Sequence, residues 1–220
     1  MATRKRKAGS KPGTSRRASP RVVRGSRKAS SATRRTPQEL ALADVARVIA
    51  ALDAPAAVIG GIAVISYGFA RLTNDIDCAV SAPREDAALI LRAFEGRGFK
   101  ARNEDPLGFA EENLVLLLRH EATGVELDVS LAQLEFESEA LASAEPRAFG
   151  QVRVPMPLIS DLLTYKALAG RPRDHQDIVE LLALGYEVDT PRIERALRWF
   201  DELMDTDRLS DWRRLQRSTR

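Results

Sequence analysis

A short apolar segment with acidic residues at alternate positions is the feature that most constrains how this chain folds. Residues 75–80 read DIDCAV, and this alternation of polar and apolar side chains has the two-residue period of a β-strand. Such a strand turns Ile76 toward a core and presents Asp75 and Asp77 side by side on its other face. Because neighbouring carboxylates raise each other's pKa and weaken folding, a fold that keeps this pair needs a cation or a base beside it.

The residues around this strand predict further helices and strands. A capping box at Thr36 and Glu39 starts a helix that runs to about residue 53. The apolar residues 56–59 stop at a glycine pair, which predicts a buried strand followed by a helix over 62–69. Farther along the chain, the patterns predict a helix at 84–95, strands at 113–119, 125–131 and 152–154, and helices after Pro157.

A mixed sheet followed by helices belongs to the α+β (α/β) class. We therefore expect a mixed β-sheet flanked by helices within residues 36–156 and a C-terminal helical region at 157–220. The longest apolar runs fall short of the roughly 20 residues that cross a bilayer, and the single cysteine, Cys78, suits a reducing compartment. We expect a soluble, cytoplasmic protein without a membrane partner, in which Cys78 is a buried strand residue.

The N-terminal arm, residues 1–35, differs sharply in composition from the rest of the chain. Residues 1–36 hold 13 of the 34 basic residues and no acid, so the other 21 basic and 31 acidic residues give the rest of the chain a formal charge of −10. A run of like charge without apolar periodicity is typical of disorder and is attracted to phosphate polyanions. We expect a disordered arm that contacts nucleic acid; a solvated tail without a specific role and an organellar transit peptide are the alternatives.

The carboxylate pair indicates a metal site. Mg²⁺ prefers hard oxygen ligands and takes one or two carboxylates together with water and substrate phosphates. A third acid is expected on a neighbouring strand, where Asp128 and Glu126 share one face. We favour Asp128 because Glu126 lies nearer the turn at residues 121–124, where Gly124 is expected to join the strands 113–119 and 125–131 as a hairpin. Three such carboxylates can hold two metal ions, and Asp128 would also act as the general base.

The glycine pair Gly60-Gly61 is expected at a strand-to-helix junction. Glycine lets backbone approach a phosphate closely, and a helix N-terminus offers free N–H groups. Arg71 is a second phosphate candidate, with a surface salt bridge to a helix acid as its alternative. Farther along, Asp174 is expected to cap the helix that runs to Leu184.

Two strings of the sequence resemble a known family. The first is VIGG at residues 58–61, thirteen further residues and then DID at 75–77; it resembles the signature of the DNA-polymerase-beta-like nucleotidyltransferase superfamily. The longer run through Arg71 and Thr73 is similar to the branch of AbiEii/AbiGii-type toxins and small related nucleotidyltransferases. A second string, from Asp161 through Lys166 to residues 171–178, resembles that branch as well.

The resemblance implies the nucleotidyltransferase fold and transfer of a nucleoside monophosphate from an NTP to a hydroxyl acceptor, tRNA or protein, with Mg²⁺ at Asp75, Asp77 and Asp128. It also implies that Lys166 contacts the triphosphate; a solvated helix lysine is the alternative. A toxin or phage-defence setting would add an antitoxin partner. Gly61 departs from the serine that many relatives carry and leaves only backbone N–H for phosphate. Transfer to a small antibiotic hydroxyl and a catalytically silent nucleotide- or nucleic-acid-binding module are the other functions that the sequence allows.

Overall fold

A computed structural model describes residues 34–219, and Arg34–Arg220 form one compact unit. The arm that is expected to be disordered and to contact nucleic acid spans residues 1–35. Its residues 1–33 lie outside the described residues, so this expectation stays a prediction. The first half of the described chain contains α1 (Pro37–Ile49), β1 (Ala56–Ile59), α2 (Gly60–Ser66), β2 (Asp75–Ser81), the 3₁₀ helix η1 (Arg84–Asp86), α3 (Ala87–Glu95), β3 (Phe99–Ala101) and α4 (Pro106–Asn113). The second half contains β4 (Val115–His120), β5 (Glu126–Ala132), α5 (Glu135–Ala142), β6 (Glu145–Phe149), β7 (Val152–Met156), α6 (Ile159–Ala169), α7 (Pro172–Ala183), α8 (Thr190–Met204) and α9 (Arg208–Ser218).

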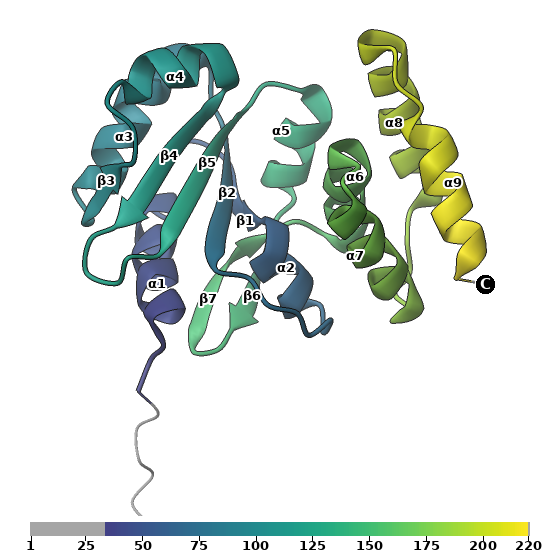
Figure 1. Cartoon of the computed structure of the whole chain (residues 1–220), viewed down its shortest axis with the longest axis horizontal. Helices are drawn as coiled ribbons and strands as arrows, with labels where there is room; N and C mark the ends of the chain where they lie inside the picture. Colours follow the sequence, from purple (N-terminus) through teal and green to yellow (C-terminus); the bar gives the residue numbers. More distant parts are fainter. Residues whose placement is uncertain (1–33, 220) are drawn as a thin grey trace, which may run out of the picture. The chain divides into compact units, whose positions relative to one another are not determined.

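The main sheet of the described residues has five strands in the order β1-β2-β5-β4-β3. Strands β2 and β5 pair in parallel, and the other neighbours pair antiparallel. Helices lie on both sides of this mixed sheet, and β6 and β7 form a separate hairpin (Figure 1). The α+β (α/β) class predicted from the sequence is thereby confirmed.

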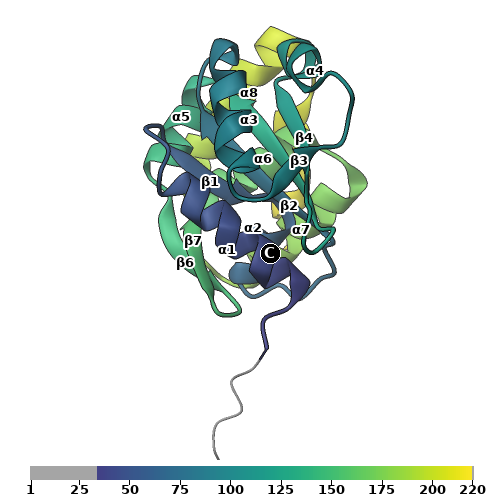
Figure 2. The same cartoon turned by 90° about the vertical axis from the view of Figure 1, so that its left-hand side faces the viewer.

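The larger hydrophobic core covers one face of the sheet and extends to residues of helices α6 to α9. Helices α1 and α3 lie over this face (Figure 2). Alternate residues of the central strands point into it, as the two-residue period requires. Fully buried examples are Ile76, Cys78, Leu127, Val129, Leu116 and Leu118. Ile76 and Cys78 therefore lie where the sequence predicts, and burial raises the pKa of the Cys78 thiol to about 12.

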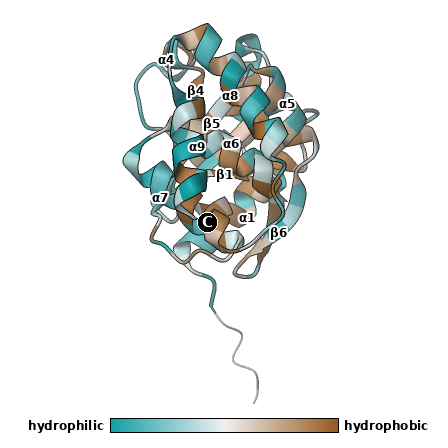
Figure 3. Ribbon diagram, turned by 90° about the vertical axis from the view of Figure 1, so that its right-hand side faces the viewer, coloured by the Kyte–Doolittle hydropathy of each residue, from teal (hydrophilic) through white to brown (hydrophobic). Residues whose placement is uncertain are grey.

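The opposite face of the sheet is lined by small residues at one end and by acids at the other. Ala57, Ala79 and Ala132 pack with Leu141 of α5 in a small second core. Small side chains let α5 lie close to the sheet, and the Ser81 and Ser138 hydroxyls are 2.9 Å apart at this contact. Helices α6 to α9 continue beyond α5 (Figure 1), and the outward surfaces of α7 and α9 are mainly hydrophilic (Figure 3).

Most elements predicted from the sequence are present, with shifted ends. The predicted helix at 62–69 is α2 and begins two residues earlier, and the predicted helix at 84–95 is divided into η1 and α3. Four elements were not predicted: β3, α4, α5 and β6. Strand β3 has only three residues, and helix α5 buries only Ala140 and Leu141, so neither has enough periodic residues for a pattern to emerge. None of the described helices is long and apolar enough to cross a membrane.

Glu39 joins the first helix to the β6–β7 hairpin. Its carboxylate accepts from the backbone N–H of Thr36 at 2.7 Å, which completes the predicted capping box, and from that of Gln151 at 2.8 Å. Gly150 has a φ of +55°, and a side chain there would overlap the Glu39 carboxylate. These donors hold the pKa of Glu39 below its ordinary value, since a hydrogen-bonded carboxylate favours its charged form.

The Glu39→Gln variant is expected to unfold at a lower temperature than the wild type at pH 7. Because the folded-state pKa of Glu39 is lowered, its contribution to stability is full above the unfolded-state value and is lost as the pH falls through the folded-state pKa. Thermal unfolding at pH 7 and below about pH 4 should therefore show a difference that shrinks on acidification. The exposed Glu104→Gln change serves as the control, and an equal loss at both pH values for Glu39→Gln would contradict this account.

Candidate active site

Four carboxylates form a block on the open face of the sheet. The parallel register of β2 and β5 sets Asp75 beside Glu126 and Asp77 beside Asp128. Register partners on neighbouring strands point to the same face and lie roughly 5 Å apart. We call these four residues the acidic block. The structure thus brings together on one face the three acids predicted as metal ligands, together with Glu126.

Asp77 carries the strongest electrostatic cost in the β2 half of the block. Burial raises its pKa above the ordinary value, and the charge of Asp75 raises it further. A backbone hydrogen bond from Gly61 and the positive charges of Lys166 and Arg171 partly oppose this rise. Within residues 34–219, neither Asp75 nor Asp77 forms a salt bridge.

The β5 half of the block is neutralised by arginines. Arg102 donates from Nη1 to Glu126 at 2.6 Å and from Nη2 to Asp128, and Arg119 donates to Glu126 at 2.8 Å. Burial raises the pKa of Asp128, and Asp77 and Asp75 add to this rise against the opposing charge of Arg102. Sequence reasoning missed both arginines.

Gly60 and Gly61 lie directly against the block. Gly60 has a φ of +64°, and a Cβ atom on it would overlap the carboxylate of Asp77. A Cβ atom on Gly61 would lie 2.5 Å from both Arg71 Nη2 and Thr73 Oγ1. The Thr73 hydroxyl fills this space and donates to Asp75 at 2.8 Å. A side chain at position 61 would therefore overlap these neighbours, which explains why the residue is glycine.

Lys166 lies in a buried charge cluster with two aspartates of α7. Its side chain is only 6% exposed, and its Nζ is 3.0 Å from both Asp174 and Asp177. The alternative of a solvated helix lysine is therefore wrong. Asp174 also accepts from the backbone N–H of Arg171 at 3.3 Å, so it caps α7 as predicted.

Arg71 extends this cluster toward the glycine pair. Its Nε is 3.4 Å from Asp177, and its side chain is 12% exposed, so the predicted alternative of a salt bridge to a helix acid is present but nearly buried. Its Nη1 is buried and makes no hydrogen bond within residues 34–219. A buried donor without an acceptor is costly, and a bound anion would supply the missing acceptor.

The donor set fits a divalent cation in part. Asp75 and Asp77 offer two carboxylates without a competing cation, which matches what Mg²⁺ takes from protein. As the side chains of residues 34–219 stand, no group of three acids, histidines or cysteines converges on one ion position. Asp128 is the predicted third ligand, and its carboxylate is held by Arg102. Asp75 and Asp77 therefore fit as metal ligands as they stand, whereas Asp128 can bind the ion only if Arg102 releases its carboxylate.

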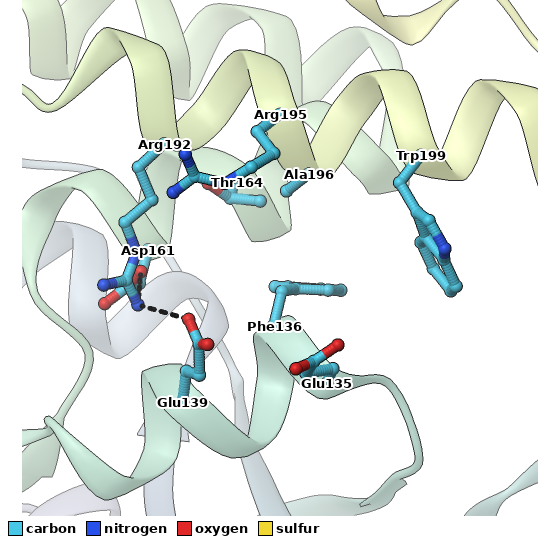
Figure 4. A pocket seen from close by; sticks show the side chains of 9 residues that line it. All are labelled: Glu135, Phe136, Glu139, Asp161, Thr164, Arg192, Arg195, Ala196 and Trp199. Atoms are coloured by element: carbon cyan, nitrogen blue, oxygen red, sulfur yellow. Dashed lines mark ion pairs between the residues drawn. The ribbon is translucent and has the colours of Figure 1, made fainter.

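A separate cavity of about 340 Å³ lies between α5, α6 and α8. Figure 4 shows Phe136 and Trp199 around it, with Arg192 turned toward Glu139 and Asp161. Arg192 is 3.6 Å from Glu139 and 3.0 Å from Asp161. None of the predicted site residues lines this cavity, so the cavity and the acidic block are different places.

No family model matches the sequence, and no curated protein matches it. The fold is similar to the crystal structure of ANT(2")-Ia in complex with adenylyl-2"-tobramycin, with a TM-score of 0.52, 15% identity and coverage of 76% of this chain and 99% of that chain. The solution structure of the antibiotic-resistance factor ANT(2'')-Ia gives a TM-score of 0.50 and 14% identity over 75% of this chain and 91% of that chain. The likeness shows the nucleotidyltransferase fold that the sequence predicts; the AbiEii/AbiGii branch stays a prediction.

The Gly60→Ala variant is expected to lose at least about 2 kcal/mol of folding stability, because the new methyl group would displace the Asp77 carboxylate in addition to straining the backbone. Gly124→Ala is the matched control, since Gly124 has a φ of +75° with nothing within 4 Å of an added Cβ. It should lose only the backbone cost of about 1 kcal/mol. Chemical denaturation of both variants measures the difference, and equal losses would mean that the contact with Asp77 has no effect on stability.

Proposed function

We propose that this protein is a metal-dependent nucleotidyltransferase that moves a nucleoside monophosphate from an NTP to a hydroxyl acceptor. The observation that carries the proposal is the Asp75–Asp77 pair, which lacks a cation of its own, lies in register with Asp128 and contacts the glycine pair. The nucleotidyltransferase fold supports it. Two neighbouring carboxylates that no salt bridge within residues 34–219 neutralises weaken folding, and desolvation of Asp77 adds to this cost, so a bound cation best explains why the pair is retained.

The residues of the block divide the chemistry between them. Asp75 and Asp77, with Asp128 as third ligand, would hold Mg²⁺, which neutralises charge on the transferring phosphoryl group when bound. Asp128 accepts the proton of the acceptor hydroxyl, and its raised pKa suits a general base. A base must lie within hydrogen-bond reach of the proton that it removes, so Asp128 has to be free of Arg102 at that step.

The triphosphate is proposed to bind beside the glycine pair. Gly60 and Gly61 carry no side chain that would keep a phosphate away from the backbone. Arg71 has a buried donor without a partner within residues 34–219. Lys166 lies close enough to lower the pKa of Asp77, and it adds positive charge on this side of the site.

The acceptor is proposed to be tRNA or a protein side chain, in a toxin or phage-defence setting with an antitoxin as partner. This part of the proposal rests on the sequence resemblance and on the basic arm, which would be attracted to a polyanion. Incubation of the purified protein with each labelled NTP, Mg²⁺ and total cell RNA or lysate tests it. Label in an RNA or protein band is the expected result, and no label in any acceptor together with no nucleotide binding would refute the proposal.

A small antibiotic hydroxyl is the second candidate acceptor. ANT(2")-Ia was crystallised with adenylyl-2"-tobramycin, and the fold of this chain is similar to it. A third candidate is a module that binds nucleotide or nucleic acid and catalyses nothing, for which the arm would be the main working part.

The Asp77→Asn variant is expected to lower nucleotide transfer at least about a hundredfold, since the metal contributes several kcal/mol to the transition state. Without metal, the same variant should be more stable than the wild type by about 1 kcal/mol at pH 7. Because burial raises the folded-state pKa of Asp77, the charged form costs stability above that pKa, and this cost disappears on acidification. Asp53→Asn, on the loop before β1, is the control. If the Asp77→Asn protein keeps the biological effect of the wild type, the module that binds nucleotide or nucleic acid without catalysis is favoured over the enzyme.

Removal of residues 1–35 separates the acceptor classes. The shortened chain is expected to keep transfer to small acceptors and to lose most transfer to RNA, because the removed segment carries 13 of the 34 basic residues. Transfer at low and high salt with both acceptor types measures this, since phosphate contacts weaken as salt rises. Undiminished transfer to RNA would exclude the arm as an acceptor-binding element.

A further inference from the structure

The positive charges around the acidic block are distributed unevenly. Arg102 forms salt bridges with both carboxylates of the β5 half, and Arg119 forms one with Glu126. The β2 half, Asp75 and Asp77, has no salt bridge within residues 34–219. Glu126 and Asp128 are thus paired with arginine side chains, whereas Asp75 and Asp77 are not.

Arg102 reaches the block along a row that crosses the sheet. Asp77 pairs with Asp128, and Asp128 pairs with Leu117 of β4. The backbone N–H of Arg102, one residue beyond β3, donates to the carbonyl of Leu117 at 2.8 Å. Its side chain therefore spans two strand spacings, about 10 Å, to reach Asp128. Only a long side chain with a forked end can do this and still bond Glu126.

The environment of Arg102 suits a group that can be released. Its Nε is buried and makes no hydrogen bond within residues 34–219, and the side chain is still 21% exposed. Release of Asp128 would not leave Glu126 without a positive charge, because Arg119 keeps its own bond to Glu126 at 2.8 Å. The backbone bond to Leu117 keeps the segment in place, so the side chain alone has to move.

We propose that Arg102 is a positioning residue that holds Asp128 in place of a divalent cation, and that binding of a second ion at Asp128 has to displace it. The inference rests on the metal site of the proposed function and adds its regulation: the first ion binds at Asp75 and Asp77 without hindrance, and the second competes with a guanidinium. Displacement also frees Asp128 to meet the acceptor hydroxyl, so that the general base becomes available only in the loaded site.

Counting of bound Mn²⁺ on the full chain without nucleotide tests this inference. Electron paramagnetic resonance of free Mn²⁺ gives the number of ions bound and their affinities for the wild type, Arg102→Ala, Arg102→Lys and Arg119→Ala. The wild type should bind one ion readily and a second one weakly. Arg102→Ala should bind the second ion at least about tenfold more tightly, because a competing unit charge has been removed. Arg102→Lys keeps the charge without the fork and should fall between the two.

Arg119→Ala is the matched control for the general effect of charge, because it also removes one arginine from the block but leaves Asp128 held. Its effect on the second ion should stay below about threefold, as for an exposed pair. The double variant Arg102→Ala/Asp128→Asn should return to one ion. Thermal unfolding establishes that each protein is folded, and if Arg102→Ala does not fold, Arg102→Lys decides the question.

Equal second-ion affinities in the wild type and Arg102→Ala would overturn the inference, as would an equal gain in Arg119→Ala. Failure to bind Mn²⁺ in every variant would overturn it together with the metal site. The predicted Mn²⁺ counts without labelled product in any acceptor would support the role of Arg102 and count against the proposed function. Labelled product together with equal second-ion affinities in the wild type and Arg102→Ala would support the proposed function and count against the role of Arg102.

Discussion

Repulsion between carboxylates on two parallel strands is the constraint on which the rest of this structure depends. Strands β2 and β5 bring Asp75, Asp77, Glu126 and Asp128 onto one face, and burial raises the pKa of both Asp77 and Asp128. The core on the opposite face fixes this arrangement, because a shift of one residue in the register would turn Ile76 and Leu127 out of the core. The hydrophobic pattern therefore keeps in place a group of charges that would otherwise separate.

The surroundings of the block reduce this repulsion by different means on its two halves. On the β2 side, the glycine pair leaves room for Asp77, and the Thr73 hydroxyl donates a hydrogen bond to Asp75. Lys166 and Arg171 add positive charge from a distance. On the β5 side, Arg102 makes direct bonds. Distant charge moderates a pKa without occupying the ligand position, whereas a direct bond occupies it. The carboxylates of the β2 half therefore have no salt bridge within residues 34–219, whereas those of the β5 half are held by arginines.

The sequence predicted those parts of the site that depend on local periodicity. The alternation at residues 75–80 predicted the orientation of Ile76 and of the acid pair, and the capping box predicted the start of α1. It could not predict Arg102, which follows a three-residue strand and acts across two strand spacings, because such a contact requires the strand order. The contact of Arg119 with Glu126 could have been predicted, because the hairpin expected around Gly124 sets these two residues opposite each other. The burial of Lys166 also required the packing of α6 on α7, which no single-helix pattern contains.

The contacts of the segment that leads into β2 connect the glycine pair to the C-terminal helices. Arg71 lies between the glycine pair and Asp177 of α7, and Arg173 of α7 donates to the backbone carbonyl of Leu72 in the segment that leads into β2. An anion that engages the buried donor of Arg71 would compete with Asp177 for the same guanidinium. Asp177 would still be balanced by Lys166, 3.0 Å away, so the cluster can lose one bond without leaving a buried charge alone. A site built in this way can change its partners while the helices stay packed.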